Sequence, residues 1–242
     1  MNRPRKLALV RVFYFATCTL IVAIGFEVAP LAAQKAEMQQ RIEEMKLAAA
    51  QNKQALAQYT WLETLTITLK GEQKGVERSE VRMGPDGQPE KTPLGVSGTE
   101  DAGGGRLKRR IVAKKKEEYK DYAQRIKSLI QRYVPPDRDK LADAYQSGNI
   151  LMGPQAGGAQ YRLVISNYVK PGDKMTLVID KAQKQIVSLS IATYLDNPQD
   201  AVNVNAQFAS IPGGPNHVSQ ETIDGVSKQL RIDILNSEYR KI

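Results

Sequence analysis

Cysteine and histidine are almost absent from this chain of 242 residues, which contains one of each, Cys18 and His217. Cys18 lies in an apolar N-terminal segment, so the remainder has no cysteine for a disulfide, a thiol nucleophile or a metal-binding thiolate. A Ser-His-Asp triad would have to use His217, which follows the stretch PGGPN without any nucleophile-elbow motif nearby. This scarcity argues against the enzyme classes that depend on cysteine or histidine.

Motifs for phosphate, dinucleotide or metal binding are also missing. The glycine-rich stretches GGGRLKRR and GPQAGGAQ lack the Gly-Lys-Ser/Thr ending of a phosphate-binding loop and the dinucleotide fingerprint. Asp137, Asp139 and Asp143 lie close together, but without the ligand spacing of a calcium loop, and they suit the start of a helix instead. We therefore predict no catalytic residue, no metal site, no cofactor and no enzymatic activity, although a hydrolase that uses two ordinary carboxylates stays open.

The N-terminus has the layout of a secretory signal peptide. Arg3, Arg5, Lys6 and Arg11 precede an apolar run at 12–26, and the small residues Ala32 and Ala33 follow. We predict cleavage after Ala33 and a periplasmic location; the alternative is an uncleaved inner-membrane anchor at 1–33 that leaves the rest facing the periplasm. Export makes nucleic acid a poor partner in spite of the net charge of +9.

Residues 106–116, RLKRRIVAKKK, form a dense basic segment. An anionic membrane surface or an acidic envelope protein would be attracted to such a segment, whereas a solvated basic edge is the simpler interpretation. The residues that would dock a headgroup or a partner are Arg106, Lys108, Arg109, Arg110, Lys114, Lys115 and Lys116.

The remaining pattern predicts an α+β fold, a single domain over 34–242 in which helices cover one face of a curved antiparallel sheet, as in a half-barrel. Helical spacing of apolar residues occurs at 34–58 and at 115–146, whereas alternation of period two occurs at 59–83 and from 160 to the end. In the stretch 173–191, DKMTLVIDKAQKQIVSLSI, two strands and a polar turn give one apolar face, which we expect the helices to cover. Residues 88–105 are rich in Gly, Pro and charge, so we predict a flexible loop there.

The order of elements resembles a known family. A signal peptide, a helix that runs into YTWLETLTITLKG, a central helical insertion and a C-terminal meander are similar to the periplasmic lipoprotein-carrier group, the LolA/LolB/RseB-like half-barrels. The resemblance implies a curved sheet, roofed by helices, that holds an acyl chain or contacts a partner protein.

A ligand cavity in such a half-barrel would be lined by the aliphatic residues of the apolar face, which could equally form a packed core. These residues are Leu65, Ile67, Leu69, Leu163, Leu177, Ile179, Leu189, Ile191, Val204, Phe208, Leu230 and Ile232. An aliphatic lining with few aromatic side chains suits an acyl chain. Our first hypothesis is therefore an exported, non-enzymatic carrier or sensor of a lipid or acyl chain. The alternative is a structural or interaction module of the cell envelope that acts through 106–116.

Overall fold

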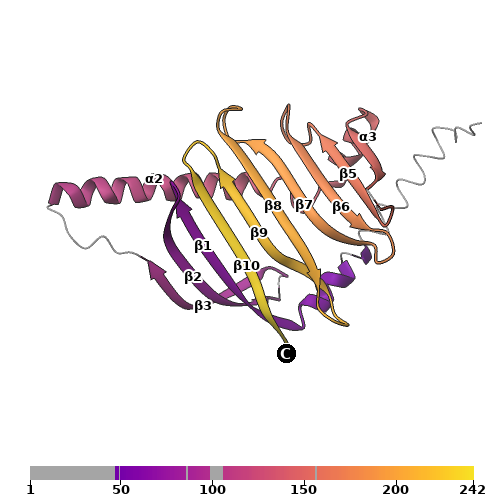
Figure 1. The fold of residues 1–242 in the computed structure, drawn as a ribbon, viewed down its shortest axis with the longest axis horizontal. Helices are drawn as coiled ribbons and strands as arrows, with labels where there is room; N and C mark the ends of the chain where they lie inside the picture. The colour runs from indigo at the N-terminus through magenta and orange to yellow at the C-terminus, as the bar shows by residue number, and fades with distance from the viewer. Residues whose placement is uncertain (1–46, 49, 86, 99–105, 156) are drawn as a thin grey trace, which may run out of the picture. The chain divides into compact units, whose positions relative to one another are not determined.

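The computed structural model describes residues 47–242 apart from 49, 86, 99–105 and 156. The predicted signal peptide at 1–33, its cleavage site and the first part of the helix at 34–58 lie outside the described residues. The predicted α+β class is confirmed, because a single sheet of ten antiparallel strands carries helices (Figure 1).

Seven of the strands follow one another as a meander; the six from residue 160 onward were predicted, and β4 before them was not. They are β4 (Ile150–Pro154), β5 (Gln160–Ser166), β6 (Lys174–Asp180), β7 (Gln185–Tyr194), β8 (Ala201–Ser210), β9 (Asn216–Gly225) and β10 (Leu230–Lys241). From β5 onward each strand pairs with its predecessor in the chain, which is the simplest connection for antiparallel strands. The hairpin of β6 and β7 corresponds to the stretch 173–191.

The three N-terminal strands extend this sheet at its far side. β1 (Tyr59–Leu69) pairs with β10, and β2 (Glu72–Met83) and β3 (Pro89–Gly98) follow outward, so the edges of the sheet are β3 and β4. Lys70 and Gly71, with φ of 54° and 81°, make the tight turn between β1 and β2. The beginning and the end of the described chain are thus neighbours in the sheet.

The prediction of a loop at 88–105 is wrong for residues 89–98, which form β3. Its backbone pairs with β2 from Met83↔Pro89 to Gly75↔Gly98. Proline is tolerated on an edge strand because one side of that strand needs no hydrogen bonds. Residues 99–105 lie outside the described residues.

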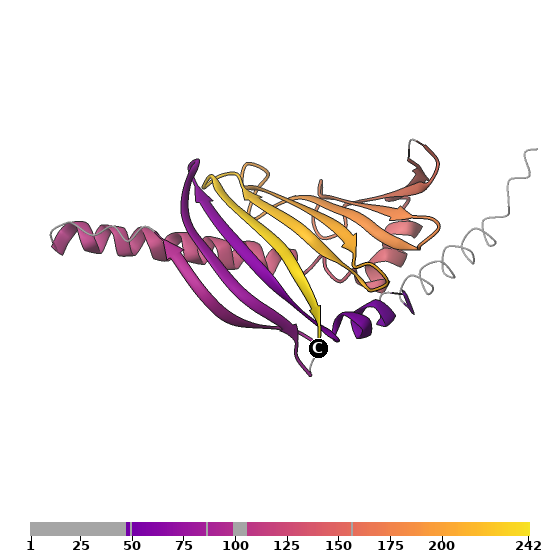
Figure 2. The same ribbon diagram turned by 60° about the horizontal axis from the view of Figure 1, so that its bottom comes forward.

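The apolar face of the sheet, here called the helix face, packs against α2 (Arg106–Ile130) and α3 (Arg138–Gln146) (Figure 2). Tyr122, Ile126 and Leu129 of α2 recur at helical spacing and are buried against the sheet. The close approach depends on Gly225, where an added Cβ would lie 2.6 Å from Cε1 of Tyr122. The predicted cover of the β6–β7 hairpin by helices is confirmed.

A buried polar network fixes the segment after α2 to the sheet. The hydroxyl of Tyr133 donates to Oδ2 of Asp173 over 2.6 Å and lies 2.7 Å from Oγ1 of Thr193. Asp173 also accepts from the backbone N–H groups of residues 168–170. Because the buried carboxylate is fully surrounded by donors, its desolvation is offset by hydrogen bonds.

Two more helical features agree with the sequence. Asp137 is the N-cap of α3 and accepts from the N–H groups of Asp139 and Lys140 over 3.0 Å each. Residues 47–56, without 49, are helical, and Asn52 exchanges two hydrogen bonds with the backbone of Asn216 at the start of β9. None of the helices in the described part of the chain combines the length and hydrophobicity of a transmembrane span.

Candidate functional site

The helix face continues past the core onto β1, β9 and β10. Directly paired residues of antiparallel strands share a face, as do residues two apart on one strand. One patch therefore extends over β1, β10 and β9. Across β1 and β10 it contains the pairs Leu65↔Ile234 and Ile67↔Ile232, and across β10 and β9 the pairs Ile234↔Glu221 and Ile232↔Ile223. We call this set the open strip: Leu65, Ile67, Glu221, Ile223, Ile232 and Ile234.

The open strip lies between two helices. At one end of β9, Gly225 sits beneath α2, and at the other end Asn216 is bonded to Asn52 of the 47–56 helix. Ile223 and Glu221 lie on β9 between these two contacts. Since neighbouring strands are about 4.8 Å apart, the patch is about 10 Å wide from β9 to β1.

Burial distinguishes the open strip from the core beside it. Leu177, Leu189 and Val204 on β6–β8 are exposed by 5%, 8% and 2%, because the helices pack on them. By contrast, every residue of the open strip remains partly exposed. Leu65 and Ile234, which lie in one row with Glu221 across the three strands, do not join the core cluster of the described residues.

The structure divides the predicted lining residues into three groups. Leu177, Ile179, Leu189, Ile191, Val204 and Leu230 are buried in the core. Ile67, Leu69, Leu163, Phe208 and Ile232 are partly buried and pack against that core. Leu65 is partly exposed in the open strip.

An acidic group stands within the open strip. Glu221 pairs with Ile234 on one side and with Ala206, a core residue, on the other. Burial raises the pKa of Glu221, and the negative charge of Glu63 raises it further, against a smaller opposing effect of Lys91. No described residue donates a hydrogen bond to the Glu221 carboxylate.

Glu63 lies beside the strip on β1 and has a partner of its own. Its side chain is only 12% exposed, and its Oε1 is 2.5 Å from Nζ of Lys91 on β3. The ion pair spans β2 above Ser79, whose backbone pairs with both Glu63 and Pro93. Lys91 is therefore engaged by Glu63 and leaves Glu221 without a direct cationic partner among the described residues.

Aromatic rings close the end of the strip near the start of β1 and the end of β10. Trp61 stacks on Tyr239 with ring centroids 5.5 Å apart, and His217 lies 4.0 Å from Tyr239. Glu238, with φ of 54°, sits where the register between β1 and β10 shifts, and this bulge turns Tyr239 toward Trp61. Burial lowers the pKa of His217. Burial also raises the pKa of Tyr239, and the negative charge of Glu63 raises it further.

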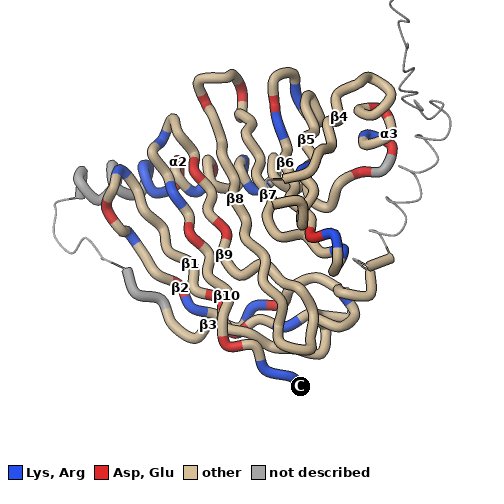
Figure 3. Tube along the Cα trace, turned by 45° about the vertical axis from the view of Figure 1, so that its right-hand side comes forward, with Lys and Arg blue, Asp and Glu red and all other residues tan. Residues whose placement is uncertain are grey.

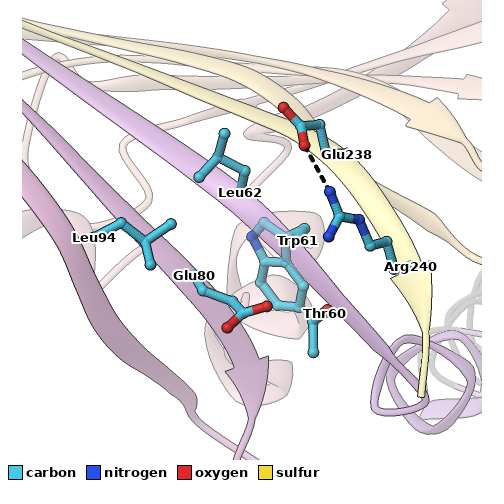
Figure 4. Close-up of a pocket in the computed structure, with 7 residues that line it drawn as sticks. All are labelled: Thr60, Trp61, Leu62, Glu80, Leu94, Glu238 and Arg240. Carbon is cyan, nitrogen blue, oxygen red and sulfur yellow. Dashed lines mark hydrogen bonds and ion pairs between the residues drawn. The ribbon is translucent and has the colours of Figure 1, made fainter.

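A small pocket of about 80 Å³ lies at the same end of the sheet (Figure 4). It is lined by Thr60, Trp61, Leu62, Glu80, Leu94, Glu238 and Arg240. Arg240 donates to Glu238 over 3.1 Å. The volume of this pocket is far below the roughly 300–1,000 Å³ of a typical ligand pocket. The pocket is therefore too small for a lipid or an acyl chain.

The predicted basic segment forms the first eleven residues of α2. Figure 3 marks Lys and Arg of the described part of this helix in blue. Lys114, Lys115 and Lys116 are exposed. The side chains of Arg106, Lys108, Arg109 and Arg110 lie outside the described part of the structure.

Sequence reasoning missed Glu221, Ile223 and Ile234 as site residues. Ile234 continues the alternation of Leu230 and Ile232, and Glu221 stands two residues before Ile223, so alternation alone places an acid on an apolar face. The pattern was obscured by the register shift between Gln207 and Phe208, where β9 contains one extra residue. A glutamate at an apolar-face position was the available signal.

Comparisons with known proteins gave a distant structural similarity. No family model and no curated protein matches the chain. Among solved structures, it is similar to the crystal structure of a DUF1329 family protein from Desulfovibrio piger, with 11% sequence identity and a TM-score of 0.38. The match covers 83% of this chain and 93% of that one.

Proposed function

We propose that this protein is an exported, non-enzymatic carrier or sensor that binds the hydrocarbon chain of an amphiphile on the open strip. The observation that carries the proposal is the contrast in burial along one apolar face. Its β6–β8 part is covered by α2 and α3, whereas Leu65 and Ile234 stay partly exposed and outside the core cluster of the described residues. An apolar patch that the described residues leave open gains free energy when a hydrocarbon chain covers it.

The chemistry of the lining favours an acyl chain. Five of the six residues of the strip are Leu or Ile, which offer flexible aliphatic contact without ring faces for flat ligands. The resemblance of the element order to the lipoprotein-carrier half-barrels points to the same ligand class. A periplasmic location, with the membrane-anchored form as the alternative, is part of this proposal.

A cross-strand pair provides the test. Leu65→Thr and Ile234→Thr place β-branched, strand-compatible side chains with hydroxyl groups in the strip. The matched control is Leu235→Thr, because Leu235 neighbours Ile234 in the chain, faces the other side of the sheet and is 51% exposed. We expect the neutral dye N-phenyl-1-naphthylamine to bind the wild type and the control, and to bind each strip variant at least about fivefold more weakly, as loss of about 1 kcal/mol requires.

Native mass spectrometry of protein purified from cells gives an independent measurement. We expect a bound amphiphile in the wild type and its loss in the Leu65→Thr, Ile234→Thr double variant. Lipid-free wild-type preparations that also fail to take up the dye contradict the proposal.

A second candidate function rests on the exposed lysines of α2, which we propose as a docking site for an anionic membrane surface. The segment 106–116 contains no acidic residue, and its last three lysines are exposed. Each basic residue close to an anionic surface contributes about 1 kcal/mol of attraction. We expect Lys114→Gln, Lys115→Gln and Lys116→Gln together to abolish sedimentation with phosphatidylglycerol vesicles.

The control for docking replaces three exposed lysines outside α2, Lys70, Lys174 and Lys241, by glutamine. Because this control removes the same total charge, equal loss in both triple variants would indicate a general charge effect and contradict a docking site. Binding that survives in the Lys114–Lys116 variant also contradicts it, and leaves an acidic envelope protein as the partner to be sought by pull-down.

A further inference from the structure

The open strip contains one carboxylate, that of Glu221. Glu221 is flanked on its own strand by Ile223 and across β10 by Ile234, so its side chain emerges among aliphatic neighbours. None of the described residues donates a hydrogen bond to it. A partly buried carboxylate without a donor lowers the stability of the folded protein, and a ligand that supplies the donor removes that cost.

The charges around Glu221 indicate which kind of ligand would donate a hydrogen bond to its carboxylate. Lys91, the cation whose charge lowers the pKa of Glu221, is paired with Glu63, with 2.5 Å between Nζ and Oε1. Glu77 pairs with Leu65 and adds a third acid to the same face. Three carboxylates and one ammonium thus face the strip, which is locally negative in a protein of net charge +9.

Aromatic rings stand at the end of the strip that Glu63 approaches. The negative charge of Glu63 raises the pKa of Tyr239, whose ring stacks on Trp61. Ring faces attract cations, and more strongly where water is partly excluded. Both the acids and the rings therefore favour a positive group at this end.

We infer that the amphiphile taken by the open strip carries a cationic ammonium head group, which Glu221 binds while the hydrocarbon chain covers Leu65 and Ile234. This inference rests on the proposed binding function and adds the class of head group. A hydrogen bond to a charged group contributes about 1.5–3 kcal/mol, which corresponds to about tenfold to a hundredfold in affinity. An anionic head group would instead meet like charge.

The test compares three amphiphiles that share one chain and differ in the head group. Dodecylammonium, dodecyl maltoside and dodecyl sulfate, each below its micellar concentration, compete with bound N-phenyl-1-naphthylamine on the full chain. We expect dodecylammonium to displace the dye at least about tenfold more effectively than the other two. Glu221→Gln should remove most of this advantage and leave the maltoside unchanged, because the chain contacts are retained.

Matched variants separate a head-group role from a general effect on charge or folding. Glu80→Gln removes one acid from the opposite face, where Glu80 pairs with Leu62, and should keep the ammonium preference. Glu221→Asp keeps the negative charge and should retain part of the preference for the ammonium head group. Retained dye binding and an unchanged far-UV spectrum establish that each variant is folded.

The outcomes distinguish the two levels of the proposal. If the wild type binds the dye and all three detergents equally, or prefers the sulfate, the head-group inference is overturned while the binding function stands. If the ammonium preference persists in Glu221→Gln, the assignment to Glu221 is overturned. If neither dye nor detergent binds, the proposed function itself fails.

Discussion

Glu221, which we propose as the residue that binds the head group, is a side chain that opposes folding at neutral pH. A strand of the helix face would be more stable with an aliphatic residue there, since its neighbours Ile223 and Ile234 are apolar. Burial raises the pKa of Glu221 above that of an exposed glutamate, and Glu63 adds to the effect in spite of Lys91. The folded protein therefore binds a proton at this position more tightly than the unfolded chain does.

The sign of the pH dependence follows from this difference. A carboxyl whose pKa is higher in the folded state lowers the free energy of unfolding as the pH rises through its folded pKa, and has no such effect below the pKa of the unfolded chain, about 4.3. We predict that Glu221→Gln raises the free energy of unfolding at neutral pH, and that the gain disappears near pH ~4. Urea unfolding followed across this range measures the effect.

Glu80→Gln is the matched control for the pH experiment. It replaces an exposed glutamate on the opposite face, where substitutions typically change the free energy of unfolding by less than about 0.5 kcal/mol. A Glu221→Gln variant that is less stable than the wild type at neutral pH would contradict the interpretation of Glu221 as a partly buried carboxylate without a hydrogen-bond donor among the described residues.

Among the elements, the position of α2 on the sheet depends on the absence of a side chain at Gly225. A Cβ there would meet Tyr122 Cε1 at 2.6 Å and Ile126 Cδ1 at 2.9 Å. The ring of Tyr122 and the methyl group of Ile126 have little room to move aside, because the two residues are only 3% and 1% exposed. The helix would have to move outward from β9.

We predict that Gly225→Ala destabilises the protein by about 1–3 kcal/mol, the usual effect of overpacking. Gly153→Ala on β4 is the control, since an added Cβ there meets nothing within 4 Å. In a Tyr122→Leu background the cost of Gly225→Ala should fall, which a double-mutant cycle measures. Equal costs in both backgrounds would show that the ring is not the obstacle.

Elements were predictable where their signal is local. The β6–β7 hairpin and the buried stripe of α2 follow from residue spacing alone. The acids at 137, 139 and 143 indicated the start of a helix, and the structure shows that Asp137 is its N-cap. β3 was missed because an edge strand tolerates Pro89 and Pro93, residues that locally argue against a strand. The same locality explains why the lining residues could be assigned to one face, but not divided into core and open strip: that division depends on where α2 rests.

At the scale of the whole molecule, the joining of β1 to β10 is the feature that sequence could not provide. Backbone pairs such as Ile67↔Ile232 join segments about 165 residues apart, and no turn or spacing marks them. The pairing makes β1–β3 part of the same sheet as the core under α2 and α3. It also places the open strip at the boundary between the two groups of strands.

This continuity leads to a prediction about cooperativity. Trp61, the only tryptophan, reports on the β1–β10 contact through its stacking with Tyr239. Ile191 lies on β7, four strands away, or about 19 Å at the usual strand spacing. If the sheet unfolds as one unit, as the predicted single domain requires, Ile191→Ala should shift the tryptophan transition in urea as far as the far-UV circular dichroism transition.

The expected loss for Ile191→Ala is about 2–5 kcal/mol, because the side chain is 2% exposed and its removal leaves a cavity. Leu235→Thr, on the exposed side of β10, should leave both transitions nearly in place. A tryptophan transition that stays fixed while the circular dichroism transition moves would mean that β1–β3 and β10 unfold separately from the core. The open strip would then lie on a hinge between two independently stable parts, and an amphiphile bound across it should bring the two transitions together.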